Sequence, residues 1–413
     1  MVFTNTSMFF SSMSYKSTVA SDTISDDVTQ RGIYNASATF DAVNATFEPG
    51  TEITETMYDY MYEDYEEYIE FKIADILNTY VLFGIIIVGL VGNVTSIVVL
   101  RCSSMFLNPP SVYLIALAIS DSFALILGGG RVWVLSLWNI DIRELHEWVC
   151  KIHHVAIYTL LDFSAWLLVA LSVDRVITVY MPLRAKLVCT RIRAVIVSLC
   201  ILITLILING HYLFTVGYFA VIIDNEVVYE SNCYIVEGLE TFHIEYWFWI
   251  DAVFASFLPF TLLMISNITI VVEIIRASQR RRQTMQAVSS SSSSDNQTRS
   301  LTIMLICLSI TFLILTGPVV VFFLLDRFNV DPKEEASYDR VKSHLYSVIF
   351  FCLMYTNNAI NFILYCVSGK KFRSSLVDVF CGSRRRRNML KDSRTSLSTS
   401  RSVLSPSDVS QTM

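Results

Sequence analysis

Polar side chains inside long apolar runs are the residues of this 413-residue chain whose types and spacing could do chemistry. A polar group deep in a bilayer is costly, so it needs a partner there. Five such groups fall near one depth on four different runs: Asn93, Asp121, Ser164, Asn357 and Asn361. One carboxylate among oxygen donors could hold a small cation such as Na⁺. The alternative is a water-filled hydrogen-bond network without an ion.

Three charged residues, which lie nearer one end of the apolar runs than the polar residues above, indicate a ligand cavity. Asp162 lies 12 residues beyond Cys150, and Arg131 and Asp251 lie in neighbouring runs. We expect a cavity with charges of both signs, which suits a peptide with a free amine or guanidinium and a polar C-terminal end. The remaining candidates for its lining are Trp133, Ile157, Tyr158, His243, Thr316 and Tyr355. The alternatives are that Arg131 snorkels to the surface and that Asp162 bonds a neighbouring helix.

Signatures of catalysis and of metal binding are missing from the sequence. The nine cysteines include no CxxC pair and no zinc-type spacing. His153 and His154 are adjacent, so they face different sides of a helix and cannot share a metal. The three glycines at 128–130 are not followed by Gly-Lys-Ser/Thr, so they indicate close helix packing rather than a phosphate loop. We expect neither an enzyme, nor a cofactor, nor a nucleic-acid partner.

Seven long helices must position these residues. The chain is 53% apolar and only 16% charged, against about 25% charged in soluble domains. Each apolar run is long enough to cross a bilayer as a helix, which is the form that satisfies the backbone in lipid. The runs are near 78–100, 110–135, 148–180, 192–215, 244–275, 301–326 and 343–367. The fold class is therefore an all-α membrane protein, a seven-transmembrane helix bundle.

The distribution of charge orients these spans. Basic residues follow the first, third, fifth and seventh spans, whereas the loop between spans four and five carries five acids and no Lys or Arg. Basic loops face the cytoplasm, so we expect an extracellular N-terminus and a plasma-membrane protein. Cys150 and Cys233 are then the two cysteines outside the bilayer, and we predict a disulfide between them.

The flanking segments read as tails and as one more short helix. Residues 1–77 form a polar tail with glycosylation acceptors at Asn5, Asn35 and Asn44. Tyrosines alternate with acids in 57–70, which fits either sulfation or a solvated acidic tail. Residues 368–381 follow the 78–367 bundle and form an amphipathic helix on the inner leaflet, ending at Cys381, either a palmitoyl site or a free thiol. The Ser/Thr-rich tail 382–413 is disordered and is open to phosphorylation.

Together these motifs resemble the rhodopsin-like, class A G-protein-coupled receptors over residues 78–381. The motifs are Gly92-Asn93, the LAISD that ends at Asp121, Trp148 with Cys150, Asp174-Arg175-Val176, Pro259, Phe312 with Pro318, and Asn361 to Tyr365. The resemblance implies that Arg175 contacts a heterotrimeric G protein and that Asp174 restrains it at rest. It implies a sodium site at Asp121, inward motion of Tyr365, and arrestin and receptor kinases acting on the tail.

Several positions depart from the family pattern. Val176 replaces the usual Tyr, Phe362 replaces the usual Pro, and Asn267 stands where a Tyr is common. Thr316 stands where the family has a Trp two residues before the span-six proline. These changes leave the fold prediction intact, but they imply a different coupling between the pocket and the Pro318 hinge, about which span six would swing outward.

The ligand class follows from absences and from the acidic surfaces. Amine receptors of this family carry an Asp where this chain has Ile157, and opsins carry a Lys at the position of Tyr355. The long acidic N-terminus favours a peptide, and the chain is similar to invertebrate neuropeptide receptors of the FMRFamide and myoinhibitory-peptide group. A small-molecule chemosensory receptor on the same fold is the alternative. A transporter fits less well, because no inverted repeat is present.

Overall fold

The computed structural model describes residues 68–223, 226–236, 238–284, 293–329 and 337–382. Three groups of predicted sites lie outside these residues: the glycosylation asparagines, the tyrosines before Tyr68 and the Ser/Thr-rich tail. Within the described residues, seven helices are long and apolar enough to cross a membrane, which confirms the predicted fold class. They are Ile69–Cys102, Pro110–Trp138, Glu147–Tyr180, Arg191–Thr215, Phe242–Arg276, Thr302–Leu325 and Val341–Ser368.

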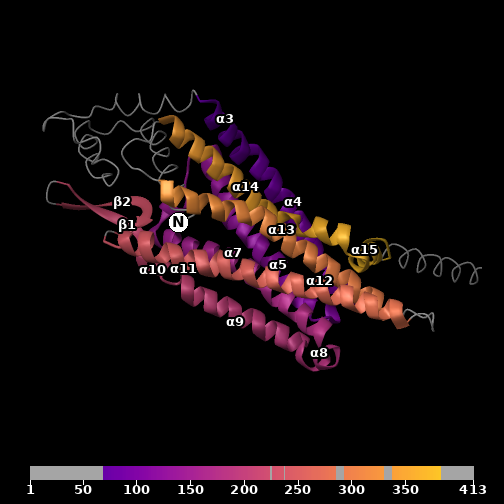
Figure 1. Ribbon diagram of the computed structural model, residues 1–413. Coiled ribbons are helices and arrows are strands. Elements are labelled where there is room, and N and C mark those ends of the chain that lie inside the picture. The colour runs from indigo at the N-terminus through magenta and orange to yellow at the C-terminus, as the bar shows by residue number, and fades with distance from the viewer. Residues whose placement is uncertain (1–67, 224–225, 237, 285–292, 330–336, 383–413) are drawn as a thin grey trace, which may run out of the picture.

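These spans lie side by side along one axis (Figure 1). The first consists of α3 (Ile69–Ile76), a π-helical turn (Leu77–Val81) and α4 (Leu82–Cys102). The second consists of α5 (Pro110–Ala124), a π-helical turn (Leu125–Gly129) and α6 (Gly130–Trp138). The third is α7 (Glu147–Tyr180), and the fourth is α9 (Arg191–Asn209), followed by α10 (Tyr212–Thr215).

The fifth span alternates between two helical geometries. A π-helical turn (Phe242–Trp247), α11 (Phe248–Asp251) and a second π-helical turn (Ala252–Phe257) lead into α12 (Leu258–Thr284). The sixth and seventh spans are α13 (Ser293–Asn329) and α14 (Ser337–Ser368). The connections contain 3₁₀ turns (Ser104–Leu107 and Ile142–Leu145) and α8 (Pro182–Val188), and α15 (Lys370–Val377) with a π-helical turn (Asp378–Gly382) follows the bundle.

Helix α7 is the central rod. Two thirds (67%) of its most apolar stretch is buried, against 28% for α13 and 22% for α9. Cys150 lies in its first turn and Arg175 near its other end, as the sequence predicted for one continuous helix. Side chains of α7 contact α5, α9, α12 and α13, and this helix connects the two ends of the bundle.

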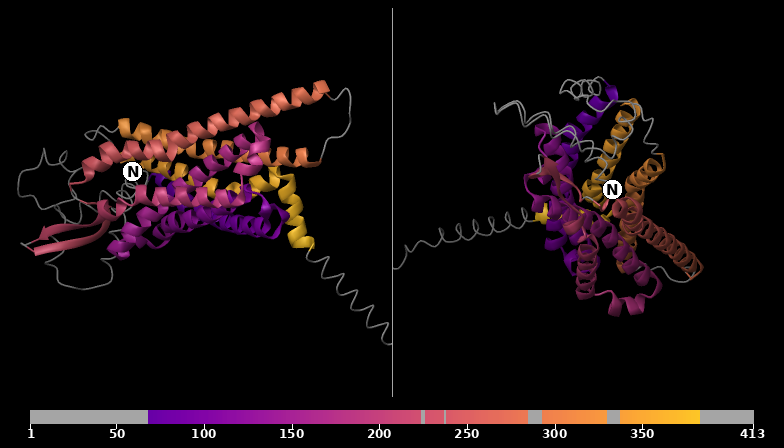
Figure 2. Two further views of the ribbon diagram at one scale, coloured as in Figure 1. Left: turned by 90° about the horizontal axis from the view of Figure 1, so that it is seen from below. Right: turned by 90° about the vertical axis from the view of Figure 1, so that its left-hand side faces the viewer.

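A β-hairpin marks one end of the bundle, here called the hairpin end. Strands β1 (Val216–Ile223) and β2 (Glu226–Ile235) pair antiparallel, from Val216 opposite Ile235 to Ile223 opposite Glu226. The hairpin projects beyond the helices in two views (Figures 1 and 2). The sequence predicts only an acidic loop for this segment, so the hairpin is an addition to the predicted architecture.

The first span begins earlier than the apolar run suggested. It starts at Ile69 rather than near 78, because α3 continues the helix through polar residues and packs against the beginning of α14. The ring of Tyr68 lies 5.6 Å from that of Tyr338, and the Tyr338 hydroxyl donates to Glu70 Oε1 at 3.1 Å. Part of the expected tail is therefore helical.

Helix α15 marks the opposite end, here called the α15 end. The amphipathic pattern after the seventh span does form the short helix that was expected. Phe372 is its anchor: it is buried, and its ring lies 5.3 Å from that of Tyr365 and 6.0 Å from that of Phe362. Cys381 is exposed just beyond it.

Candidate functional site

A cavity of about 130 Å³ lies among α7, α11, α12, α13 and α14. Most of its wall is apolar, including Phe248, Phe323 and Met354. Its acidic groups are Asp162 of α7 and Asp251 of α11, and no Lys, Arg or His is among the described residues that line it. The cavity therefore carries carboxyl groups alone, in contrast to the mixed charges that the sequence predicted.

The two carboxyl groups are held differently. Asp162 is buried, and its Oδ2 accepts a hydrogen bond from Asn209 Nδ2 of α9 at 3.0 Å. Asp251 of α11 is half-buried. A buried carboxylate needs hydrogen bonds or a cation to offset its desolvation. Two carboxyl groups that line one cavity could therefore hold the cationic group of a ligand.

Four of the nine predicted pocket residues line this cavity, and five do not. Those that do are Tyr158, Asp162, Asp251 and Thr316. Ile157 and Tyr355 instead meet at Gly128, where an added Cβ would lie 2.7 Å from Ile157 Cδ1 and 2.4 Å from the Tyr355 hydroxyl. The glycine run thus permits close helix packing, as expected, and that packing occupies both side chains.

Trp133 and His243 also face away from the cavity. Trp133 donates from Nε1 to the Thr79 carbonyl at 3.0 Å, and its ring stacks on Phe83. His243 lies in an aromatic cluster near the hairpin end, with ring centroids 5.6 Å from His211 and 5.8 Å from Tyr212. Both residues join helices to one another.

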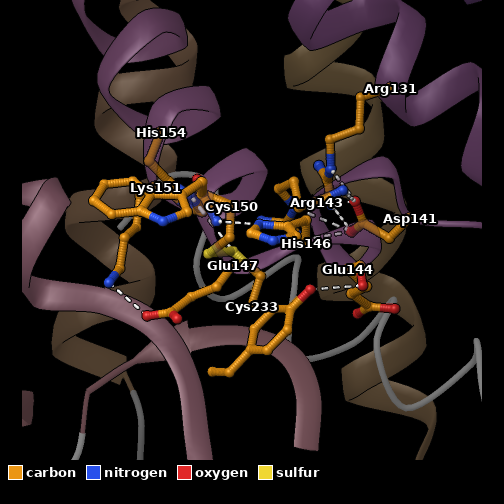
Figure 3. Close-up of a disulfide and its surroundings, with 12 residues drawn as sticks. Arg131, Asp141, Arg143, Glu144, His146, Glu147, Cys150, Lys151, His154 and Cys233 are labelled. Atoms are coloured by element: carbon orange, nitrogen blue, oxygen red, sulfur yellow. Dashed lines mark hydrogen bonds and ion pairs between the residues drawn. A yellow bond between two sulfur atoms is a disulfide. The ribbon is translucent and has the colours of Figure 1, made fainter.

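Arg131 is buried in a charge cluster instead of lining the cavity or reaching the surface. Asp141 Oδ2 lies 2.6 Å from Arg131 Nη2 and 2.6 Å from Arg143 Nη2 (Figure 3). Burial alone would raise the pKa of Asp141, but the two guanidinium groups hold it well below its usual range. Arg131 was expected to line the ligand cavity. It does not, because it pairs with Asp141, and its charge is therefore not available to a ligand.

The predicted disulfide between Cys150 and Cys233 is present, and it ties β2 to the start of α7 (Figure 3). His154 Nδ1 lies 3.7 Å from Cys233 Sγ. Two cysteines and a histidine could suggest a metal site, but the sulfurs are bonded to each other and offer no thiolate. A second link is the hydrogen bond from the Tyr218 hydroxyl to the Glu144 carbonyl at 2.8 Å.

A cluster of buried polar side chains around Asp121, here called the polar core, adjoins the cavity. Asp121 is fully buried and accepts from Ser164 Oγ at 2.8 Å and from Asn361 Nδ2 at 2.6 Å, which joins α5, α7 and α14. Asn93 donates instead to the Asn358 carbonyl at 3.1 Å. Ser164 and Asn357 also line the cavity, so the cavity reaches the polar core.

Toward the α15 end lie residues that the sequence predicts to take part in signalling. Asp174 and Arg175 are buried and form an ion pair with each other. Tyr365 is buried nearby in the apolar cluster of that end. In α13, Phe312 and Thr316 line the cavity, and Pro318 lies two residues further along the same helix. One helix therefore connects the cavity wall to the proline.

Sequence reasoning missed Asp141, Arg143 and Asn209. A signal for the first two was present, because an acid two residues before an arginine in a short loop often forms a local ion pair. The choice of Arg131 as the second partner depends on Asn139, whose left-handed conformation (φ 54°) ends α6 and turns the chain back. Nothing in the sequence paired Asn209 with Asp162.

Comparisons with known proteins identify the family of this chain. The model of the 7 transmembrane receptor (rhodopsin family) matches residues 92–365. Galanin receptor 2b of Danio rerio is 24% identical over 309 residues, which cover 74% of this chain and 75% of that receptor. The sex peptide receptor of Drosophila melanogaster is 23% identical over 329 residues, 74% of this chain and 73% of that receptor.

A third relative is named for a lipid ligand and not for a peptide. Lysophosphatidic acid receptor 6 of Mus musculus is 28% identical over 130 residues, which cover 30% of this chain and 37% of that receptor. The family match spans all seven helices from within the first to within the last, and it includes the cavity, the polar core and the Asp174–Arg175 pair. The chain belongs to the rhodopsin family of seven-transmembrane receptors.

Proposed function

We propose that this receptor is activated by an extracellular peptide that places an amine or guanidinium group between Asp162 and Asp251. The observation that carries the proposal is the cavity lined by two carboxyl groups and by no cationic side chain among the described residues. Two of the three relatives named above are called receptors for galanin and for sex peptide. A phosphate ligand, as in the name of the third relative, would meet like charge there.

The proposed orientation places the hairpin end outside the cell and the α15 end in the cytoplasm, at the plasma membrane. It is supported by the basic residues Lys370, Lys371 and Arg373 at the α15 end. A heterotrimeric G protein would engage that end and contact Arg175 once its pairing with Asp174 is released. Agonist would bind better to the conformation in which α13 has moved outward, and so shift the population toward it.

The test is a calcium readout in cells that express the chain with a promiscuous Gα subunit and receive a library of amidated and free-acid peptides. Asp162→Asn and Asp251→Asn should each raise the half-maximal concentration of the active peptide by about 10- to 100-fold, the value of a charge-assisted hydrogen bond. Asp339→Asn is the control. It removes an exposed carboxylate from the first turn of α14, outside the cavity, and should have no effect. Activation that is indifferent to both cavity variants would contradict the proposed site.

Silence across the library, with the receptor verified at the surface, would count against a peptide ligand and favour a small molecule on the same fold. If a peptide of the library activates the native receptor, loss of the calcium signal in Arg175→Ala at unchanged peptide binding would assign Arg175 to G-protein coupling. Unchanged signalling by this variant would remove it from the mechanism.

A sodium ion at Asp121 is part of the same proposal. The donor set suits a small hard cation, since it combines a carboxylate, a hydroxyl and amide side chains. The buried Asn93 Oδ1 has no protein partner among the described residues. Asn361 presents its NH₂ group to Asp121, so it would have to turn its amide oxygen to the ion. Replacing Na⁺ by choline should lower the melting temperature of the native receptor but not that of Asp121→Asn; equal melting in both salts would exclude the site.

The remaining expectations concern the surfaces around the bundle. Glycans on Asn5, Asn35 and Asn44 would lie outside the cell, and a palmitoyl chain on Cys381 would anchor the exposed end of α15 in the inner leaflet. Phosphorylated residues of the tail would recruit arrestin. Hydroxylamine-sensitive labelling with a palmitate analogue that persists in Cys381→Ser would reject the lipid site.

A further inference from the structure

A second cavity lies on the flank of the bundle, toward the α15 end. Its volume is about 360 Å³, and it runs between α7 and α9. Its apolar wall comprises Trp166, Val169, Ala170, Val173, Ile177, Val197 and Ile201. Nothing in the receptor mechanism above uses it. Val173 and Val197 are 42% and 39% exposed, so the cavity is an open groove and not a closed void.

The groove opens toward the hydrocarbon region of the bilayer. Both of its long walls belong to helices that cross the membrane. Along α7, the eleven positions from Trp166 to Ile177 correspond to about 16 Å at the rise of an α-helix. The indole of Trp166 closes one end of the groove, and its Nε1 is held by the Phe254 carbonyl at 3.1 Å. A hydrocarbon chain is the occupant that matches an open apolar channel facing lipid.

The other end of the groove is polar and positive. Arg193 lines it and is exposed, and its guanidinium donates from Nη1 to the Leu187 carbonyl at 2.8 Å. No carboxylate pairs with Arg193 within the described residues. The residue also lies in the first turn of α9, whose N-terminal dipole favours an anion. Asp174 lines the same region, but its carboxylate is paired with Arg175.

We propose that this groove binds an anionic phospholipid, with one acyl chain between α7 and α9 and its negatively charged head group at Arg193. Basic pockets between transmembrane helices on the cytoplasmic side favour anionic head groups. The assignment of this side to the cytoplasm rests on the proposed function. Because Asp174 forms part of the wall, the bound lipid contacts the helix turn that carries the Asp174–Arg175 pair, and its presence would bias that pair.

Trp166 provides a local reporter for this site. The full-length receptor would be reconstituted in phosphatidylcholine nanodiscs containing brominated phosphatidylserine or brominated phosphatidylcholine, and tryptophan quenching would be measured. The chain has six tryptophans, so Trp166→Phe identifies the component that belongs to the groove. We expect relative binding to be about fivefold stronger for the serine lipid, which corresponds to about 1 kcal/mol for one arginine at the head-group level.

Two matched pairs of variants separate head-group recognition from chain binding. Arg193→Gln should remove the preference for the serine lipid, whereas Arg184→Gln, which loses an equal charge from the exposed surface of α8, should keep it. Val197→Phe fills the groove and should reduce quenching by both lipids. Val195→Phe changes a valine of similar exposure, 41%, outside the groove on the same helix and should not.

Equal quenching of the Trp166 component by the two lipids in the native receptor would overturn the proposal, whatever the variants do. So would equal losses in the two arginine variants, which would indicate a general surface-charge effect. The assay uses neither a peptide nor a G protein. Failure of the lipid site is therefore distinguishable from failure of the proposed receptor function.

Discussion

At the scale of single residues, the charges inside this receptor fall into two kinds. Some are paired within the protein, such as Arg131 and Arg143, which share the carboxylate of Asp141. Others, such as the buried Asp162 and the half-buried Asp251, face a cavity and have no cationic partner in its wall among the described residues. Removing the partner of a buried paired charge destabilises the fold, whereas a charge left without a counter-charge at a cavity is available to a ligand.

Removing the shared carboxylate should therefore affect stability rather than recognition. Asp141→Asn removes the carboxylate that two buried guanidinium groups share, and we expect a loss of about 3–5 kcal/mol. The measurement is thermal unfolding of the purified receptor in detergent. Asp339→Asn is the control, since that carboxylate is exposed. An unchanged melting temperature in Asp141→Asn would show that the cluster is not a stabilising element.

The pH dependence of this effect follows from the lowered pKa of Asp141. A carboxyl group whose pKa is lower in the folded state stabilises the protein above its unfolded pKa of about 3.9, and the contribution is lost only as the pH falls through the folded value. The deficit of Asp141→Asn should therefore be constant between about pH 5 and pH 8. A deficit that shrinks within this window would mean that the carboxyl group titrates there.

At the scale of elements, each helix is positioned by a few buried anchors. For α15 the anchor is Phe372, because most of the other residues of this short helix are exposed or half-buried. Phe372→Ala should cost about 3–5 kcal/mol of packing, which exceeds what eight residues can supply alone. Hydrogen exchange of the backbone amides of Lys370–Val377 should then rise sharply. Phe380→Ala, at a ring that is 55% exposed, should leave the exchange unchanged.

The elements also show what could be predicted from the sequence. The seven spans, the disulfide and α15 followed from the length of apolar runs, from charge asymmetry and from helical periodicity. The hairpin had a signal too, since Asp224-Asn225 separates two runs rich in β-branched and aromatic residues. Which face of each helix meets the cavity could not be predicted, because the rotation of a span depends on packing such as that of Ile157 and Tyr355 against Gly128.

At the scale of the whole molecule, the spans divide by how firmly they are held. The most apolar stretches of the second, third and seventh spans are 61%, 67% and 56% buried, whereas those of the first, fourth, fifth and sixth spans are 33%, 22%, 28% and 28% buried. The first group also carries the Asp121 hydrogen bonds, which join its three helices. A ligand in the cavity touches both groups. Motion should therefore occur where α13 moves against a fixed frame of α5, α7 and α14.

Pro318 makes the sixth span the element that moves. It has no N–H to donate to the Ile314 carbonyl, so the helix is weakened within the stretch that lines the cavity, which runs from Phe312 to Leu324. Spin labels on exposed Ile303 of α13 and Ile192 of α9 report the separation at the α15 end. The background would lack the exposed Cys102, Cys200 and Cys381. Agonist should lengthen this distance by about 5 Å, roughly one helical turn.

Pro318→Ala restores the missing hydrogen bond and should stiffen the helix. We expect the agonist-induced change in distance to shrink by at least about half, while peptide binding changes less than about threefold, because the carboxyl groups that bind the ligand lie on other helices. A full-sized displacement in Pro318→Ala would show that α13 moves as a rigid rod about its ends. A parallel loss of binding and motion would show instead that the proline shapes the cavity, since Phe312 and Thr316 precede it in the same helix.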